Sequence, residues 1–361
     1  MDGGFLGPQS GPMETFESLV RAEFAPENTY LNTASTGLLP ARTVTAMRAA
    51  VESVAAGRPA DMFADVEAAR ASFARLVGVP AGRVAAGASV AVYSGLIAAS
   101  LPQGAEVLTA EADFSSVVTA FHVRGDLKVR AVPLERMAES VRPGTALVAV
   151  SAAQSADGRV ADLEGIRDAA RAHGARTYID ASQAAGWLPV RADAYDYVSS
   201  VAFKWLVCPR GVAFLVVPED LGGLTPVFAG WVAGEAPWDS CYGPVEELAH
   251  SARRFDESPS LFSYAGARHS LALIEELGVA HVHAHDLALA GRFREGLHAL
   301  GHEAIPAPGS PIVSVPGLGH RQPDLSRAGV EVSDRAGNLR AAFHLYNTPA
   351  DVDRLLDVLS G

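Results

Sequence analysis

The central part of the chain alternates short apolar runs with amphipathic stretches. The apolar runs predict strands at residues 106–109, 129–132, 146–150, 177–180, 196–202 and 212–217. Helical spacing of apolar positions between them predicts helices at 114–123 and 162–173. Strands separated by helices in this rhythm indicate a mainly parallel sheet with helices on both faces. We therefore expect an α/β fold.

The pattern on either side of this region is mostly helical. Helical spacing and helix-start signals predict helices at 13–24, 40–56, 61–77, 90–101, 263–277, 286–300 and 349–359. A strand is predicted at 338–346, and residues 222–260 are rich in Gly, Pro and Trp without periodicity. We expect three parts: an N-terminal segment (1–37) that packs on the small domain and the site, a large domain (38–255) and a smaller α+β domain (256–361).

Composition and charge narrow the functional class. The 361 residues carry a net charge of -12 with no basic stripe, which argues against a nucleic-acid partner. No apolar run approaches the roughly 18 residues that span a bilayer. The N-terminus lacks a secretory pattern, and two cysteines cannot form a disulfide framework. We expect a cytoplasmic protein that binds neither nucleic acid nor membrane.

Lys204 lies in an unusually apolar stretch, Ala-Phe-Lys-Trp-Leu, and is one of only two lysines in the chain. Burial disfavours the charged form of an amine, so this side chain is suited to lose its proton, which an arginine cannot do. The alternative is that the amine reaches solvent while its methylene groups stay buried.

Other side chains suit an aldehyde cofactor held by that lysine. Asp180 ends a predicted strand, where ligands bind in parallel sheets, and a buried carboxylate there would keep a ring nitrogen protonated. Ala88 and Ser89 begin a predicted helix whose amides could bind phosphate. Phe114 could stack on a ring, and Arg340 could hold a substrate carboxylate. Each also has a structural alternative: a cap, a core residue or a surface ion pair.

Two further stretches carry polar residues. Residues 33–37, Thr-Ala-Ser-Thr-Gly, form either a loop that leads into a helix or a loop that faces substrate through Ser35. The alternating trio His281, His283 and His285 lacks acidic or thiol partners at a metal-ligand spacing. We expect the trio to be a solvated helix start, and we predict no metal site.

Three segments resemble the class V aminotransferase family of fold-type I pyridoxal 5′-phosphate (PLP) enzymes. They are YIDASQAAGWLPV (178–190), FKWLVCPRGVAFL (203–215) and LRAAFHLYNTPADVDRLL (339–356), and the similarity extends from residue 30 to the final helix. The family includes cysteine desulfurases, kynureninases and isopenicillin N epimerase-like proteins. The resemblance implies a seven-stranded-type sheet, a PLP cofactor and a small amino-acid substrate.

The resemblance also implies individual roles. Lys204 would form the Schiff base, with Asp180 on the pyridine nitrogen. Gln183 would lie near the phenolate oxygen and Phe114 over the ring, while Ala88 and Ser89 hold the phosphate and Arg340 the substrate carboxylate. The segment RRFDESP resembles one through which a second subunit reaches the phosphate, so Ser258 would act in trans in a homodimer with shared active sites.

The chain departs from the family pattern beside the lysine. Many members have Ser three residues before it and His directly before it, where this chain has Val201 and Phe203. Ser199 or Ser200 is a candidate for the phosphate contact that the missing serine would make. No cysteine follows Cys241, which disfavours sulfur transfer through a cysteine persulfide. Cys208 is expected to be a packing residue.

The reaction is the least determined feature. Transamination is our leading hypothesis, and a β-eliminating C-S lyase or an epimerase are alternatives that would use the same residues. A non-catalytic relative that keeps the fold for binding or assembly is the alternative from another class. The co-occurrence of Asp180, Lys204 and Arg340 argues against it.

Overall fold

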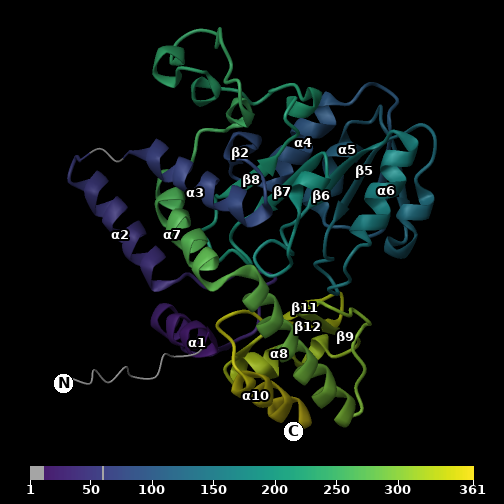
Figure 1. Cartoon of the computed structure of the whole chain (residues 1–361). Coiled ribbons are helices and arrows are strands. Elements are labelled where there is room, and N and C mark those ends of the chain that lie inside the picture. The colour runs from purple at the N-terminus through teal and green to yellow at the C-terminus, as the bar shows by residue number, and fades with distance from the viewer. Residues whose placement is uncertain (1–11, 59–60) are drawn as a thin grey trace, which may run out of the picture.

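The computed structural model describes residues 12–58 and 61–361, in which a seven-stranded sheet forms the centre of the large domain (Figure 1). The strand order is β2-β8-β7-β6-β5-β3-β4. Only β8 runs antiparallel to its neighbours in this sheet. The sheet strands are β2 (Val84–Gly87), β3 (Glu106–Ala110), β4 (Lys128–Val132), β5 (Thr145–Ser151), β6 (Arg176–Asp180), β7 (Tyr197–Val201) and β8 (Ala213–Val216).

Helices cover both faces of this sheet because its strands are apolar on both sides. Alternate residues of β5 point to opposite faces, so Leu147 and Ala149 join one apolar cluster while Val148 and Val150 join another. The helices on the first face are α4 (Val90–Ser100) and α5 (Ser115–Val123), and those on the second are α3 (Met62–Val77), α6 (Leu163–His173) and α7 (Leu261–Leu277).

A smaller domain follows the large one (Figure 1). Its antiparallel sheet, in the order β11-β12-β9, packs with α8 and α10 around a separate apolar cluster. Strand β1 pairs in parallel with β10, which joins the N-terminal segment to this domain. The elements are β1 (Thr29–Tyr30), β9 (Ile312–Val315), β10 (Val330–Glu331), β11 (Ser333–Arg335), β12 (Asn338–Ala342), α8 (Val279–Ala299), α9 (Gln322–Arg327) and α10 (Pro349–Ser360).

The remaining helices join the two parts. Helix α7 lies beyond the predicted boundary at residue 255, yet it packs against α3 and α2 (Ala41–Ala55) of the large domain. Helix α1 (Pro12–Glu23) contributes Phe16 and Val20 to the largest apolar cluster.

The segment 222–250 contains only short 3₁₀ turns and projects from the large domain, in green at the top of Figure 1. Among the described residues, no helix combines the length and apolar character needed to cross a bilayer.

Several short elements, among them β1, β10, β11 and α9, were not predicted, and three further differences concern longer or better defined stretches. Strand β2 was missed because its four residues, Val-Ala-Ala-Gly, are too short and too small to show a period. Strand β12 ends at Ala342, four residues earlier than predicted. Helix α8 begins at Val279, seven residues earlier than predicted, so the three histidines lie within its first turns; His281 is exposed, whereas His283 and His285 are half-buried.

These histidines each contact a backbone carbonyl. His281 contacts Leu277 O, His283 contacts Trp187 O at 3.1 Å, and His285 contacts Asn347 O at 3.0 Å. His283 also stacks on the Trp187 ring. His283 and His285 therefore link α8 to distant parts of the molecule, whereas the contact of His281 is local.

The parallel strands bring their carboxyl ends to one edge of the sheet. Asp180 and Ser151 end β6 and β5, Phe114 follows β3, and Lys204 follows β7. Strand β2 runs in the same direction as β7, because both are antiparallel to β8. The N-terminus of α4 therefore lies at this edge too, where ligands of open α/β sheets bind.

Candidate functional site

A cavity of about 410 Å³ lies at this edge and receives side chains from both domains. Its walls come from the 34–35 loop, the starts of α4 and α5, the ends of β5 to β7 and the β11–β12 hairpin. The lining residues are Ala34, Ser35, Ser89, Val90, Phe114, Ser116, Ser155, Asp180, Ser182, Val201, Phe203, Lys204, Arg210 and Arg335.

Lys204 is the only lysine in this cavity, and its side chain is buried. Burial lowers the pKa of its amine to about 8, although the nearby Asp180 carboxylate opposes the shift. Arg340, Arg210 and Arg335 lower the pKa further through charge repulsion. A fraction of this amine is therefore unprotonated at neutral pH and can act as a nucleophile or base. The environment of Lys204 thus suits the role that the sequence predicts for it, that of a nucleophilic amine.

Phe114 presents its ring to the same cavity. The residue is 43% exposed, and its ring centroid lies 5.0 Å from Lys204 Nζ. Asp113 fixes the start of α5, because its carboxylate accepts hydrogen bonds from Phe114 N and from Ser151 N and Oγ. An exposed aromatic face held beside the amine is a surface on which a planar ring could stack.

Asp180 is buried and has one carboxylate oxygen free for a ligand. Its Oδ1 accepts hydrogen bonds from Ser182 N at 3.0 Å and Ser182 Oγ at 2.5 Å. Its Oδ2 accepts none from the part of the chain that the structure describes, while the residue lines the cavity. Burial raises the pKa of Asp180, and the bonds from Ser182 and the charge of Lys204 counteract that rise. A protonated ring nitrogen would satisfy the second oxygen.

The predicted phosphate site is the N-terminus of α4. Ser89 lines the cavity and caps the helix, with Oγ accepting from Val92 N at 3.4 Å. The Ala88 amide donates to the Glu257 carboxylate at 3.1 Å. This position therefore already attracts an anionic group of the chain itself, as the exposed amides of a helix start do. Ser258, the residue expected to act in trans, follows directly and is exposed.

Gln183 lies behind the cavity wall, and its amide is fully engaged. Its Nε2 donates to Ala34 O and Ser155 Oγ, and its Oε1 accepts from Trp205 Nε1 at 2.7 Å. The side chain is 3% exposed and does not line the cavity. In this arrangement Gln183 fastens the loops around Lys204, and its expected contact with a cofactor oxygen stays a prediction.

Arg340 is likewise buried just behind the wall, on β12. Its two terminal nitrogens donate to Ser35 Oγ at 2.7 Å, to Ser155 O and Oγ and to Ser333 Oγ. Its Nε has no hydrogen-bond partner among the described residues. Burial and the neighbouring Arg335 lower the pKa of Arg340 to about 9, so it is cationic at neutral pH. A buried cation that contacts only neutral groups favours an anionic ligand.

Several lining residues were not predicted. Ser116 lies two residues after Phe114 in the first turn of α5, and Ser155 lies in the loop after β5. Arg210 and Arg335 also line the cavity. No local pattern marks these residues, since single serines and arginines are common on any surface; only the packing of the two domains brings them together.

The replacement serines before the lysine are not at the cavity. Ser199 and Ser200 are fully buried in β7, where Ser199 Oγ contacts the Tyr178 hydroxyl and Ser200 Oγ donates to Val201 O. Cys208 is buried, which raises the pKa of its thiol well above the ordinary range, and Cys241 is exposed on the 222–250 segment. Neither cysteine lines the cavity.

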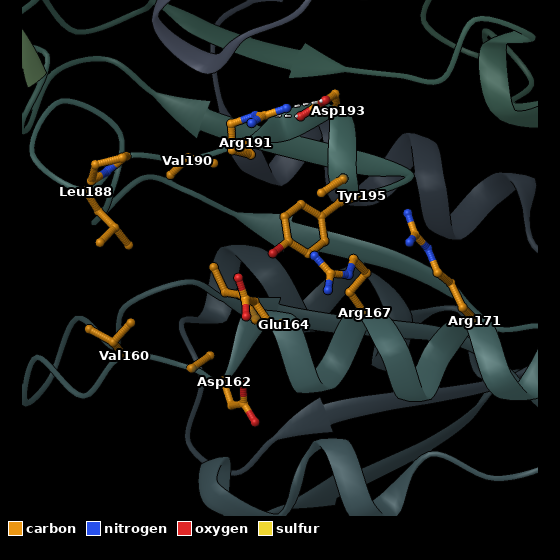
Figure 2. A pocket seen from close by; sticks show the side chains of 14 residues that line it. Val160, Asp162, Glu164, Arg167, Arg171, Leu188, Val190, Arg191, Asp193 and Tyr195 are labelled. Carbon is orange, nitrogen blue, oxygen red and sulfur yellow. Dashed lines mark hydrogen bonds and ion pairs between the residues drawn. The ribbon is translucent and has the colours of Figure 1, made fainter.

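A larger hollow of about 700 Å³ lies elsewhere, between α6 and residues 188–195. Figure 2 shows its arginines spread along the rim, with Arg191 paired to Asp193. Arg167 pairs with the neighbouring Asp168. It contains none of the residues predicted for catalysis, so we assign the site to the smaller cavity.

The residues of that cavity fit PLP in three respects. A lysine of lowered pKa can bind the aldehyde, an unpaired oxygen of Asp180 can bind the ring nitrogen, and the α4 N-terminus lies at the same edge to bind the phosphate. Phe114 supplies an exposed aromatic face beside the lysine.

The fold of this chain is similar to that of solved PLP-dependent enzymes. The chain superposes on the cystine C-S lyase C-DES in complex with cysteine persulfide with a TM-score of 0.84, at 23% identity over 92% of this chain and 97% of that one. A cysteine desulfurase from Thermococcus onnurineus NA1 gives a TM-score of 0.83, at 21% identity over 95% and 97%. These likenesses confirm the predicted PLP-enzyme fold.

Comparison with known sequences identifies the family to which the chain belongs. The chain is 26% identical over 312 residues to the uncharacterized aminotransferase YcbU of Bacillus subtilis (strain 168), covering 81% of this chain and 83% of that protein. It is 29% identical over 383 residues to isopenicillin N epimerase of Streptomyces clavuligerus, covering 91% and 93%. The model of the family described as aminotransferase class-V matches residues 29–355. The chain therefore belongs to the class V aminotransferase family of PLP-dependent enzymes.

Proposed function

We propose that this protein is an aminotransferase that acts on a small amino acid through Lys204. Bound PLP would supply an electron-withdrawing ring that stabilises negative charge at the substrate α-carbon. Asp180 would hold the ring nitrogen, and Ser89 with the α4 amides the phosphate. Arg340 would bind the substrate carboxylate through its paired nitrogens, which suit the two carboxylate oxygens.

Lys204 would move the proton. At a pKa of about 8 its amine is partly unprotonated at neutral pH, so Nζ can take a proton from the α-carbon and deliver it to a second carbon. The lysine is 6% exposed, so little of its side chain is in contact with solvent. Ser182 holds the Asp180 carboxylate in place through two hydrogen bonds to Oδ1.

The observation that carries this proposal is that the cavity offers a single base. Its other lining residues with ionisable side chains are Asp180, Arg210 and Arg335, and no histidine, cysteine, tyrosine or glutamate lines it within the described residues. Epimerisation through two bases needs a second proton carrier on the opposite side of the substrate. A single lysine suits reactions in which one group both removes and returns the proton, as in transamination.

β-Elimination remains the second candidate, because it also needs one base. It is favoured by the structural likeness to a cystine C-S lyase. Transfer of sulfur to an enzyme cysteine is disfavoured, since Cys208 is buried and Cys241 lies outside the cavity.

A product analysis separates these reactions. The PLP-loaded protein is incubated with single L-amino acids, with and without a 2-oxo acid acceptor. Transamination yields a new amino acid only when the acceptor is present, whereas elimination yields a 2-oxo acid and ammonia without it. Formation of the D-amino acid would contradict the single-base proposal. Lys204→Ala should abolish every product, and a protein that binds no PLP would refute the whole assignment.

We further propose a homodimer in which Ser258 reaches the phosphate of the partner subunit. Support comes from the exposure of Ser258 and from exposed apolar side chains on the neighbouring 222–250 segment, among them Trp238 and Tyr242. Light scattering would give the oligomeric state. Mixing Ser258→Asp subunits with Lys204→Ala subunits should restore part of the activity that each variant lacks, because one site of the mixed dimer is then intact.

A further inference from the structure

Three guanidinium groups meet at one turn of the cavity wall. Arg340 Nη2 and Arg335 Nη2 both donate to Ser35 Oγ, at 2.7 and 2.9 Å. Arg210 Nη2 donates to the next residue, Thr36 Oγ1, at 2.8 Å. Arg210 and Arg335 line the cavity directly.

This positive charge has no counterpart in the described part of the protein. None of the three arginines forms an ion pair with an acidic side chain there, although many other arginines of the chain do. Within the described residues, the only carboxylate that lines the cavity is that of Asp180, and the charge of Lys204 acts on it directly. One substrate carboxylate would neutralise one arginine and leave two unpaired.

The two outer arginines are held in place rather than loose. Arg335 ends β11 at a two-residue turn in which Ala336 and Gly337 both have positive φ, 52° and 83°. A positive φ costs an alanine about 1 kcal/mol or more, and such strain gathers at ligand sites. Arg210 stacks on the Phe203 ring, with 4.2 Å from Cζ to the centroid. Phe203 is one of the two residues that depart from the family pattern beside the lysine, and its ring contacts the Arg210 guanidinium.

We propose that the substrate is an amino acid whose side chain ends in a second carboxylate, bound by Arg335 and Arg210 while Arg340 binds the α-carboxylate. This inference rests on the proposed function and names its substrate class. Arg340 and Arg335 share one hydroxyl oxygen, so the two carboxylates lie close together. The geometry therefore fits a short diacid of the size of aspartate or glutamate.

The test compares acids with their uncharged amides. For the PLP-loaded enzyme, kcat/KM for glutamate and aspartate should exceed that for glutamine and asparagine by about tenfold or more. Arg335→Met should lower kcat/KM for the two acids by about tenfold, mainly because KM rises. The same variant should change kcat/KM for the two amides by less than about threefold. Arg171→Met, an exposed arginine on α6, is the matched control and should change neither.

Three results would overturn the inference. The amides could react as well as the acids. Arg335→Met could lower both groups equally, which would assign Arg335 to the α-carboxylate. O-Phosphoserine could be preferred to both diacids, which would show that Arg335 and Arg210 bind a phosphate group and not a carboxylate.

A binding measurement keeps this inference separate from the reaction type. Glutarate and valerate have five carbons each but differ by one carboxylate, and neither carries an amine. Calorimetry on the PLP-loaded protein should show glutarate binding about tenfold more tightly than valerate, with the difference lost in Arg335→Met. Equal binding would refute the second anion site even if transamination is observed. Preferential binding without transamination would refute the proposed function alone.

Discussion

The amine nitrogen of Lys204 lies 5.0 Å from the centroid of the Phe114 ring, although the two residues are on different loops of the large domain. The contact joins the loop after β3 to the loop after β7. It places a flat apolar surface beside an amine that burial makes less basic.

Lys204 should destabilise the PLP-free protein at neutral pH. Its pKa is about 8 when folded and 10.5 when unfolded, so the unfolded chain binds more protons between these values and stability rises with pH across that window. Below pH 8 the full cost, up to about 3 kcal/mol, is present. Lys204→Met should therefore raise the free energy of unfolding at pH 7, with the gain shrinking from pH 8 to 10.5. Urea denaturation at several pH values measures it.

The control for this experiment is Lys128→Met, which changes the only other lysine, an exposed residue of β4. It should leave the pH dependence unaltered. Equal stability of Lys204→Met and the parent at pH 7 would contradict the assigned environment of the amine.

Phe114→Ala should weaken PLP binding. Loss of an aromatic stacking partner costs about 0.5–1.5 kcal/mol, which corresponds to a rise of about two- to tenfold in Kd. Phe114→Tyr keeps the flat ring and should bind nearly as tightly as the parent. Absorbance titration of PLP-free protein gives each Kd, and Phe262→Ala, at a partly exposed aromatic on α7, serves as the control. Unchanged binding in Phe114→Ala would rule out stacking.

Glu257→Gln should tighten PLP binding. The Glu257 carboxylate accepts from the Ala88 amide at the start of α4, where it would repel a phosphate. Removing this charge should lower the Kd of PLP by about three- to tenfold, because partial exposure screens the repulsion. Glu246→Gln removes an exposed charge from the 222–250 segment and should have no such effect. Weaker binding in Glu257→Gln would show that the carboxylate organises the phosphate site.

Arg340→Lys should raise KM more than it lowers kcat. Lysine keeps the positive charge but cannot reach Ser35 and Ser155 together, so the two-point grip on a carboxylate is lost. We expect KM to rise by about ten- to a hundredfold for every substrate, acids and amides alike. Steady-state kinetics would check this, and Arg327→Lys on the surface is the control. An effect confined to diacids would exchange the roles of Arg340 and Arg335.

Asp286→Asn should destabilise the protein strongly. His344 Nδ1 lies 2.8 Å from Asp286 Oδ2, while His344 Nε2 donates to the carbonyl of Trp205, directly after Lys204. Both ring nitrogens contact oxygen atoms, and both side chains are fully buried. Changing the Asp286 carboxylate should therefore cost about 3–5 kcal/mol, because a buried polar partner loses its contact. The double variant Asp286→Leu, His344→Phe should recover most of that loss in urea denaturation; no loss in the single variant would contradict a stabilising role of this pair.

Local information was enough to predict most of the elements. Strands β3 to β8 and helices α2 to α6 follow from apolar periodicity, because period and burial are coupled within a few residues. The same holds for Lys204 and Asp180, whose unusual positions in apolar runs are visible in the chain alone. Periodicity failed at β2 and at the start of α8, where short or histidine-rich runs carry no clear period.

What the sequence determined by itself was the fold class and the residues that stand out chemically within one segment. The tertiary structure decided which distant residues meet: Ser35, Arg210 and Arg335 come together at one turn although up to 300 positions separate Ser35 from Arg335. It also showed that Gln183 and Ser199 are engaged elsewhere. The physical reason is that secondary structure depends on neighbours along the chain, whereas a binding site depends on packing between domains, which no short window of sequence contains.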